Sequence, residues 1–152
     1  MAERGSKQEF PAFGRLTYDT QYGESWWSGE VTLVAFDKPF PVLVRAKGDG
    51  PSQAQIIAFS RIIAGSEDLR RRASKPMADL HREGGLLPGG ADARDEAVWN
   101  HLVPEQIEMS DERYYRDGRI MGALLFVSTL HDSFVPAIET ADGEFVRVLS
   151  GT

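Results

Sequence analysis

The three histidines, His81, His101 and His131, are the side chains of this sequence best suited to acid–base chemistry near neutral pH. None of them lies in a metal-binding spacing such as H-E-x-x-H, and the chain contains no cysteine. His81 lies on the expected polar side of a helix, and His101 lies near a helix end, where it would complement the helix dipole. The sequence therefore predicts no catalytic residue, no metal site and no cofactor.

His131 is followed directly by Asp132 and Ser133, so the three residue types of a hydrolase triad are adjacent. Catalytic triads assemble from residues that are distant in sequence, and neighbours along an extended chain point to opposite faces. A turn in which Asp132 and Ser133 bond their own backbone is the simpler interpretation. His131 and Asp132 stay candidates for a binding site. The alternative function is thus a small-ligand-binding domain or a hydrolase-type enzyme that uses a pocket near His131.

Aromatic residues offer a second kind of site. Trp26 and Trp27 are consecutive in an expected strand, so one of them should face inward and the other outward. The outward tryptophan, together with Tyr22, Tyr114 and Tyr115, would supply the rigid anchors that protein interfaces favour. A surface tryptophan covered by another part of the chain is the alternative. These residues predict a surface for binding another protein.

Composition limits the classes of partner. The chain has 152 residues, and its 41% hydrophobic and 26% charged residues are typical of one globular domain. The net charge of −6 would repel nucleic acid and attract a basic protein. The first residues lack the apolar block of a secretion signal, and no run approaches the roughly 20 apolar residues of a membrane span. We expect a cytoplasmic protein, monomeric or homodimeric, that binds neither nucleic acid nor membrane.

Residues 119–130 form the longest nearly uncharged run of the sequence. From Ile120 to Val127 both alternating sets of positions are apolar or small, which is typical of a strand covered on both faces. A buried helix is the alternative, but the short length and the flanking turn residues favour a strand. We expect residues 119–130 to be the central strand of one sheet.

Alternating patterns predict three strands in the first part of the chain and four, including the central one, in the last part. The expected strands are residues 10–19, 26–36 and 40–47, then 106–110, 119–130, 134–140 and 145–149. The dipeptides Asp117-Gly118 and Asp142-Gly143 predict two-residue hairpin turns.

Apolar steps of three and four residues predict two or three helices after Pro51, in residues 52–64, 66–80 and a short stretch after Asp92. The glycine-rich residues 84–92 should be flexible. The expected fold is α+β: a mainly antiparallel sheet from two β blocks of about three and four strands, with the helices between them packed on one face. Residues 1–9 should form a disordered tail, and residues 10–152 a single α+β domain.

Two short motifs resemble a family of small bacterial domains. Phe13-Gly14-Arg15-Leu16-Thr17-Tyr18-Asp19, followed by Trp27-Ser28-Gly29-Glu30-Val31, is similar to the F-G-x-L-x-Y-D and W-x-G-x-V opening of that family. The resemblance implies strands, then a helical pair with an early glutamine, which Gln53 or Gln55 would supply, and then more strands. Residues 130–134 depart from the family's W-D-x-E-H-G segment, so any function of that segment does not carry over.

Members of such families occur beside polymorphic-toxin genes, and the resemblance therefore implies an immunity protein that acts by stoichiometric binding. The acidic charge, the surplus of aromatic residues and the lack of a catalytic constellation agree with this role. We expect a non-enzymatic, cytoplasmic, immunity-like protein that blocks a partner, such as a basic toxin.

Overall fold

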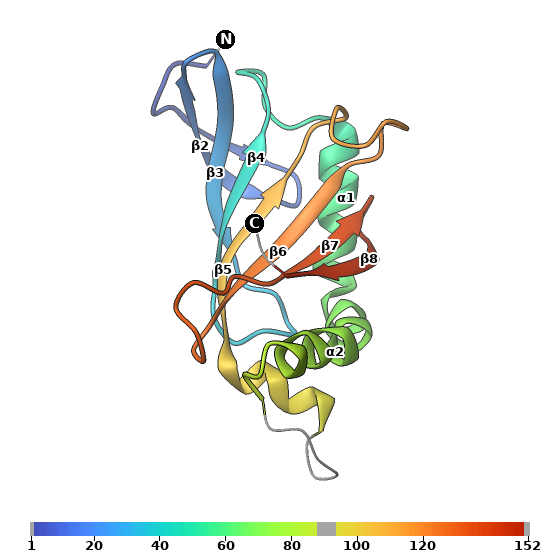
Figure 1. The fold of residues 1–152 in the computed structure, drawn as a ribbon. Helices are drawn as coiled ribbons and strands as arrows, with labels where there is room; N and C mark the ends of the chain where they lie inside the picture. Colours follow the sequence, from blue (N-terminus) through green and yellow to red (C-terminus); the bar gives the residue numbers. More distant parts are fainter. Residues whose placement is uncertain (1, 88–93, 151–152) are drawn as a thin grey trace.

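Eight strands form one sheet in which neighbours in sequence are also neighbours in space (Figure 1). The computed structural model describes residues 2–87 and 94–150, so residues 88–92 of the segment predicted to be flexible lie outside it, as does the expected helix start at Asp92. The strands are β1 (Lys7–Phe10), β2 (Gly14–Gln21), β3 (Glu24–Val31), β4 (Phe40–Arg45), β5 (Leu102–Met109), β6 (Met121–Ser128), β7 (Ala137–Ala141) and β8 (Glu144–Leu149).

In the described part of the chain three helices connect β4 to β5: α1 (Gln53–Ala64), α2 (Ser66–Glu83) and the 3-10 helix η1 (Asp95–His101). All strand pairs are antiparallel except β4 and β5, which pair in parallel with Val42 opposite Ile107. A parallel pair needs a long crossover between its strands, and the helices provide it. Among the described residues no helix is both long and apolar enough to cross a membrane.

The prediction of an α+β fold with two or three helices and a mainly antiparallel sheet is confirmed, but its finer form is wrong. The strands do not stand as two blocks with helices between them, because the β4–β5 pair joins all eight into one continuous sheet. Nor do the helices pack on one face. Figure 1 shows α1 behind the sheet and α2 across its lower end, while η1 continues directly into β5 at Leu102.

The N-terminal residues 1–9 were expected to be a disordered tail, but they contribute strand β1, which pairs with β2 from Lys7 to Phe10. The backbone N–H of Gly5 also donates to the carbonyl of Tyr18 at 2.7 Å. The N-terminal segment is ordered because Phe10 follows it, and the ring of Phe10 packs edge-on against Trp27 with the ring centroids 4.9 Å apart. A polar segment thus becomes ordered because one aromatic residue at its end reaches the core.

The prediction that residues 119–130 contain a strand covered on both faces is confirmed by β6, which pairs with β5 on one side and β7 on the other. The prediction that it is the central strand is wrong, because β6 is the sixth of the eight strands in the sheet. Leu124 and Phe126 face the main core and are fully or almost fully buried. Met121 and Ala123, on the opposite face, are also more than nine-tenths buried. Both faces of β6 are therefore covered over its first half, as the continuous apolar run indicates.

Candidate functional site

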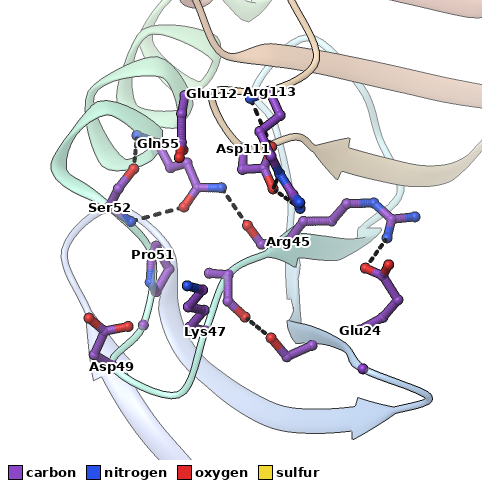
Figure 2. A pocket seen from close by; sticks show the side chains of 14 residues that line it. Glu24, Arg45, Lys47, Asp49, Pro51, Ser52, Gln55, Asp111, Glu112 and Arg113 are labelled. Carbon is purple, nitrogen blue, oxygen red and sulfur yellow. Dashed lines mark hydrogen bonds and ion pairs between the residues drawn. The ribbon is translucent and has the colours of Figure 1, made fainter. Parts of the chain in front are cut away.

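A polar cleft of about 520 Å³ opens at the end of the sheet where α1 begins. Three chain segments line it: residues 23–25 at the β2–β3 turn, residues 45–52 between β4 and α1, and residues 111–113 after β5. Figure 2 shows their side chains converging, with Arg45 reaching toward Glu24 and with Arg113 above Asp111. We call this feature the polar cleft.

Gln55, in the first turn of α1, fixes the back wall of the polar cleft. Its side-chain amide donates to the carbonyls of Arg45 and Ser110, each at 2.8 Å, and its Oε1 accepts from the N–H of Ser52 at 2.9 Å (Figure 2). The Ser52 hydroxyl in turn accepts from the N–H of Gln55, which completes a capping box. One buried side chain therefore connects β4, β5 and the start of α1.

The β2–β3 hairpin is attached to the cleft by two further hydrogen bonds. Ser25 Oγ donates to the carbonyl of Ala46 at 2.9 Å, and Trp27 Nε1 donates to the carbonyl of Lys47 at 2.8 Å. Trp27 is fully buried, so this predicted binding residue supports the cleft from inside and presents no surface to a partner. Trp26 faces outward and is half-buried, as the alternation of a strand requires.

Charges of both signs line the polar cleft. Arg45 pairs with Glu24 at 3.8 Å and with Glu108 at 3.4 Å, and Arg113 pairs with Asp111 at 2.6 Å. The hydrogen bond from Arg113 lowers the pKa of Asp111 below its ordinary value. The cleft lining contains neither histidine nor cysteine, and its polar side chains are carboxylates, arginines, one lysine, serines and one glutamine.

Three more charged residues line the cleft: Lys47, Asp49 and Glu112. Within the described part of the chain none of them forms a direct ion pair. Their charges are therefore available to a ligand. Sequence reasoning missed these residues, because single charged residues in loops follow no pattern that distinguishes a site from ordinary solvated surface.

Tyr22 and Tyr114, far apart in the sequence, each directly adjoin a residue that lines the polar cleft, Gly23 and Arg113 respectively. Tyr22 follows β2 in the two-residue turn Tyr22-Gly23 and is 94% exposed. Tyr114 is 54% exposed and adjoins Arg113, which lines the cleft. Two of the aromatic positions that the sequence analysis selected are thus exposed and adjoin residues of the cleft lining.

Tyr115 has a different role from Tyr114. Its hydroxyl donates to the carboxylate of Glu139 on β7, which also accepts from Arg147 Nε at 3.1 Å, and the guanidinium of Arg119 lies 4.8 Å from the centre of its ring. Burial, and then the contact with Glu139, raise the pKa of Tyr115 above its ordinary value. Tyr115 therefore anchors the segment between β5 and β6, and it positions Arg113 and Tyr114 beside the cleft.

His131 and Asp132 lie away from the polar cleft, in the exposed segment between β6 and β7. That segment follows the end of β6 at Ser128, whereas the opposite end of β6 adjoins Ser110 near the cleft. His131 Nδ1 accepts from the N–H of Ser133 at 3.3 Å and lies 3.0 Å from its hydroxyl oxygen. These local bonds are those of a turn and leave His131 and Asp132 apart from the other predicted residues.

No protein-family model, curated protein or solved structure matches this sequence. The resemblance to bacterial immunity-type domains therefore remains a prediction from short motifs. The function has to be inferred from the cleft and the residues around it.

Proposed function

We propose that this protein is a non-enzymatic binding protein that blocks a partner protein in the bacterial cytoplasm, in the manner of an immunity protein. The observation that carries the proposal is Tyr22, which is 94% exposed at the tip of a hairpin beside the polar cleft. A tyrosine supplies a large contact area while losing little conformational freedom, and for this reason it is enriched at binding hot spots. Tyr114, which is 54% exposed and adjoins Arg113 of the cleft lining, provides a second such anchor.

The hairpin that carries Tyr22 is ordered before any partner binds. Tyr22 has φ 52° and Gly23 has φ 80°, the left-handed pair typical of the tight turns that match the twist of two strands. Thr20 Oγ1 donates to the carbonyl of Glu24 at 2.8 Å across this turn, and Ser25 ties the same hairpin to Ala46. Binding a partner therefore costs little conformational entropy in the backbone of this hairpin, and this favours high affinity.

The charge of the protein indicates a basic partner. The chain carries 23 acidic and 17 basic residues, and two carboxylates of the cleft, Asp49 and Glu112, have no direct ion pair among the described residues. An acidic surface accelerates the approach of a basic protein, and salt screens this effect. We expect the association rate to fall as ionic strength rises.

The test is the double variant Tyr22→Ala/Tyr114→Ala. We expect it to weaken the complex by about thirtyfold or more, as the loss of a hot spot of about 2 kcal/mol does. Isothermal titration against the purified product of the adjacent gene measures the change. Val34→Ala is the matched control, because Val34 is 79% exposed and lies outside the cleft lining, and it should leave the affinity unchanged.

Two results would contradict the proposal. One is that the double variant binds as tightly as the natural protein while its melting temperature is unaltered. The other is that the adjacent gene product does not bind and affinity capture from native lysate yields no stoichiometric partner.

A small polar ligand in the cleft is the second candidate, because the cleft volume of about 520 Å³ lies within the range of roughly 300–1,000 Å³ usual for ligand pockets. A thermal-shift screen with metabolites separates the two functions, since a ligand well above its dissociation constant raises the melting temperature by mass action. A ligand shift that survives Tyr22→Ala/Tyr114→Ala but is lost in Lys47→Ala would favour this alternative. The pocket lies away from His131, so that histidine should not affect it.

A further inference from the structure

His81 is a fully buried histidine in the last turn of α2. Its Nδ1 lies 2.7 Å from the carbonyl oxygen of Met77. Its Nε2 is the one buried side-chain polar atom without a hydrogen-bond partner among the residues that the structure describes. The sequence analysis expected this residue on a solvated helix face, and that expectation is wrong.

The contact with Met77 determines which nitrogen carries the proton. A carbonyl oxygen can only accept a hydrogen bond, so Nδ1 of His81 is the donor. In the neutral ring Nε2 is then an acceptor that no group satisfies. A second proton would have to bind at Nε2, where it would place a charge in the interior of the protein.

The ring of His81 packs against the segment that links β6 and β7. Phe134 of that segment meets the imidazole edge-on, with the ring centroids 4.9 Å apart. Backbone hydrogen bonds hold the two ends of the segment: Thr129 N–H donates to the carbonyl of His101 at 2.8 Å, and Phe126 N–H donates to the carbonyl of Pro136 at 2.9 Å. Between these ends Ser128 N–H donates to the carbonyl of Phe134 at 3.2 Å, and residues 131–133 are exposed. We call residues 129–136 the β6–β7 strap.

Within residues 2–87 and 94–150, no carboxylate compensates a charge on His81. Burial, the largest effect, lowers its pKa; the bond to Met77 raises it, and the charge of His101 on η1 lowers it further. Other charged groups of the packed elements have partners of their own or are exposed. They are Arg61 of α1, Asp95 and Glu96 of η1, Glu144 and Arg147 of β8, and His131 and Asp132 of the strap.

We propose that His81 and Phe134 form an acid-sensitive latch, in which protonation of His81 releases the β6–β7 strap. Release would expose Phe134 together with Leu130, which is already 36% exposed, and would turn a covered end of the sheet into an apolar surface. The latch is independent of the polar cleft at the other end of β6.

The direction of the pH effect follows from linkage. In the released strap His81 is solvated and takes up a proton near its ordinary pKa of about 6.5, whereas the packed ring takes it up only at lower pH. At pH values between the lowered pKa of the packed ring and about 6.5, release of the strap is therefore accompanied by the uptake of one proton by His81. The packed state is most stable above about pH 6.5 and loses stability as the pH falls through the lowered pKa of His81.

Hydrogen–deuterium exchange of peptides covering residues 126–136 tests the latch at roughly pH 7.5 and 5.5, on either side of the ordinary histidine pKa. After correction for the intrinsic pH dependence of exchange, we expect the strap to open up to about tenfold more often at the lower pH, the most that one proton gives per pH unit. His81→Phe should remove this difference, because a phenylalanine packs in the same place and cannot be protonated. Phe134→Ala should leave the strap open at both pH values.

His131 is the necessary control, since it is the histidine within the strap itself and bonds to Ser133. His131→Asn should keep the pH difference of the natural protein. If His131→Asn abolishes it, or if acid loosens the whole sheet equally with the strap, the latch is disproved. An NMR titration of the natural protein guards against misfolded variants: a pKa of His81 at or above about 6.5 would also overturn the proposal.

Discussion

Gln55→Ala is expected to lower the free energy of unfolding by about 3 kcal/mol. Gln55 is 2% exposed. Its side-chain amide N–H donates to the carbonyls of Arg45 and Ser110, and its Oε1 accepts from the N–H of Ser52. Alanine leaves these backbone groups without the partner, and each unsatisfied buried group costs about 1–3 kcal/mol. Urea unfolding, followed by fluorescence, measures the loss.

Gln53→Ala is the matched control, because Gln53 lies in the same helical turn and is exposed. It should change the stability by less than about 0.5 kcal/mol. Gln55→Glu makes the test sharper: it keeps an acceptor for Ser52 but sets a carboxylate against two carbonyl oxygens, so it should be at least as harmful as alanine. If Gln55→Ala is as stable as Gln53→Ala, Gln55 does not connect the three segments.

Gly143→Ala is expected to destabilise the protein by about 3 kcal/mol, combining left-handed strain of about 1 kcal/mol with overpacking of about 2 kcal/mol. Gly143 has φ 86°, and a Cβ at this position would lie 2.5 Å from Arg61 Cβ and 2.8 Å from the carbonyl oxygen of Ala58. These atoms belong to the backbone and the base of a side chain on α1, so they cannot move aside easily. Calorimetric or denaturant unfolding gives the difference.

Gly23→Ala separates the two contributions. Gly23 has φ 80° and occupies the corresponding position of the β2–β3 turn, but a Cβ there would meet nothing within 4 Å. We expect a loss of about 1 kcal/mol from backbone strain alone. Equal losses in Gly23→Ala and Gly143→Ala would mean that the β7–β8 turn does not pack tightly on α1.

Local signals in the sequence predicted much of the sheet. Asp142-Gly143 makes the expected two-residue hairpin between β7 and β8, because such a turn depends on only a few neighbouring residues. Asp117-Gly118 carries the same signal, but there the prediction is wrong, since it lies within the longer connection between Met109 and Met121. Tyr115, which lies in that connection, donates a hydrogen bond to Glu139 on β7. This tertiary contact overrides the local preference of Asp117-Gly118 for a two-residue hairpin turn.

The prediction that His81 faces solvent was wrong, although the sequence contains the pattern that places His81 on the buried face of its helix. Leu69, Ala73 and Met77 recur at steps of four, and His81 is the next residue in that series. All four are buried, whereas Leu80, expected on the apolar stripe, is only half-buried. A polar residue on the buried face of a helix was assigned to the solvent because of its type rather than its position.

The polar cleft could not be predicted, because residues 111–113 join the other two segments that line it only through the parallel pairing of β4 with β5. Gln55 shows why the sequence alone was insufficient. The motif resemblance allowed either Gln53 or Gln55, and only packing shows that Gln55 is the buried one. Tyr22 and Tyr114 were predicted together as anchors of a binding surface, but that each adjoins a residue of the cleft lining required the fold.

The single parallel pair also governs how fast the chain can assemble. β1–β4 and β5–β8 are joined internally by antiparallel pairs between consecutive strands, which close over short distances along the chain. The contact of Val42 with Ile107 must close a loop that includes every helix, and such distant contacts form slowly because chain entropy opposes them. Pairing of β4 with β5 should thus be the rate-limiting step of folding, and the complete polar cleft forms only after that step.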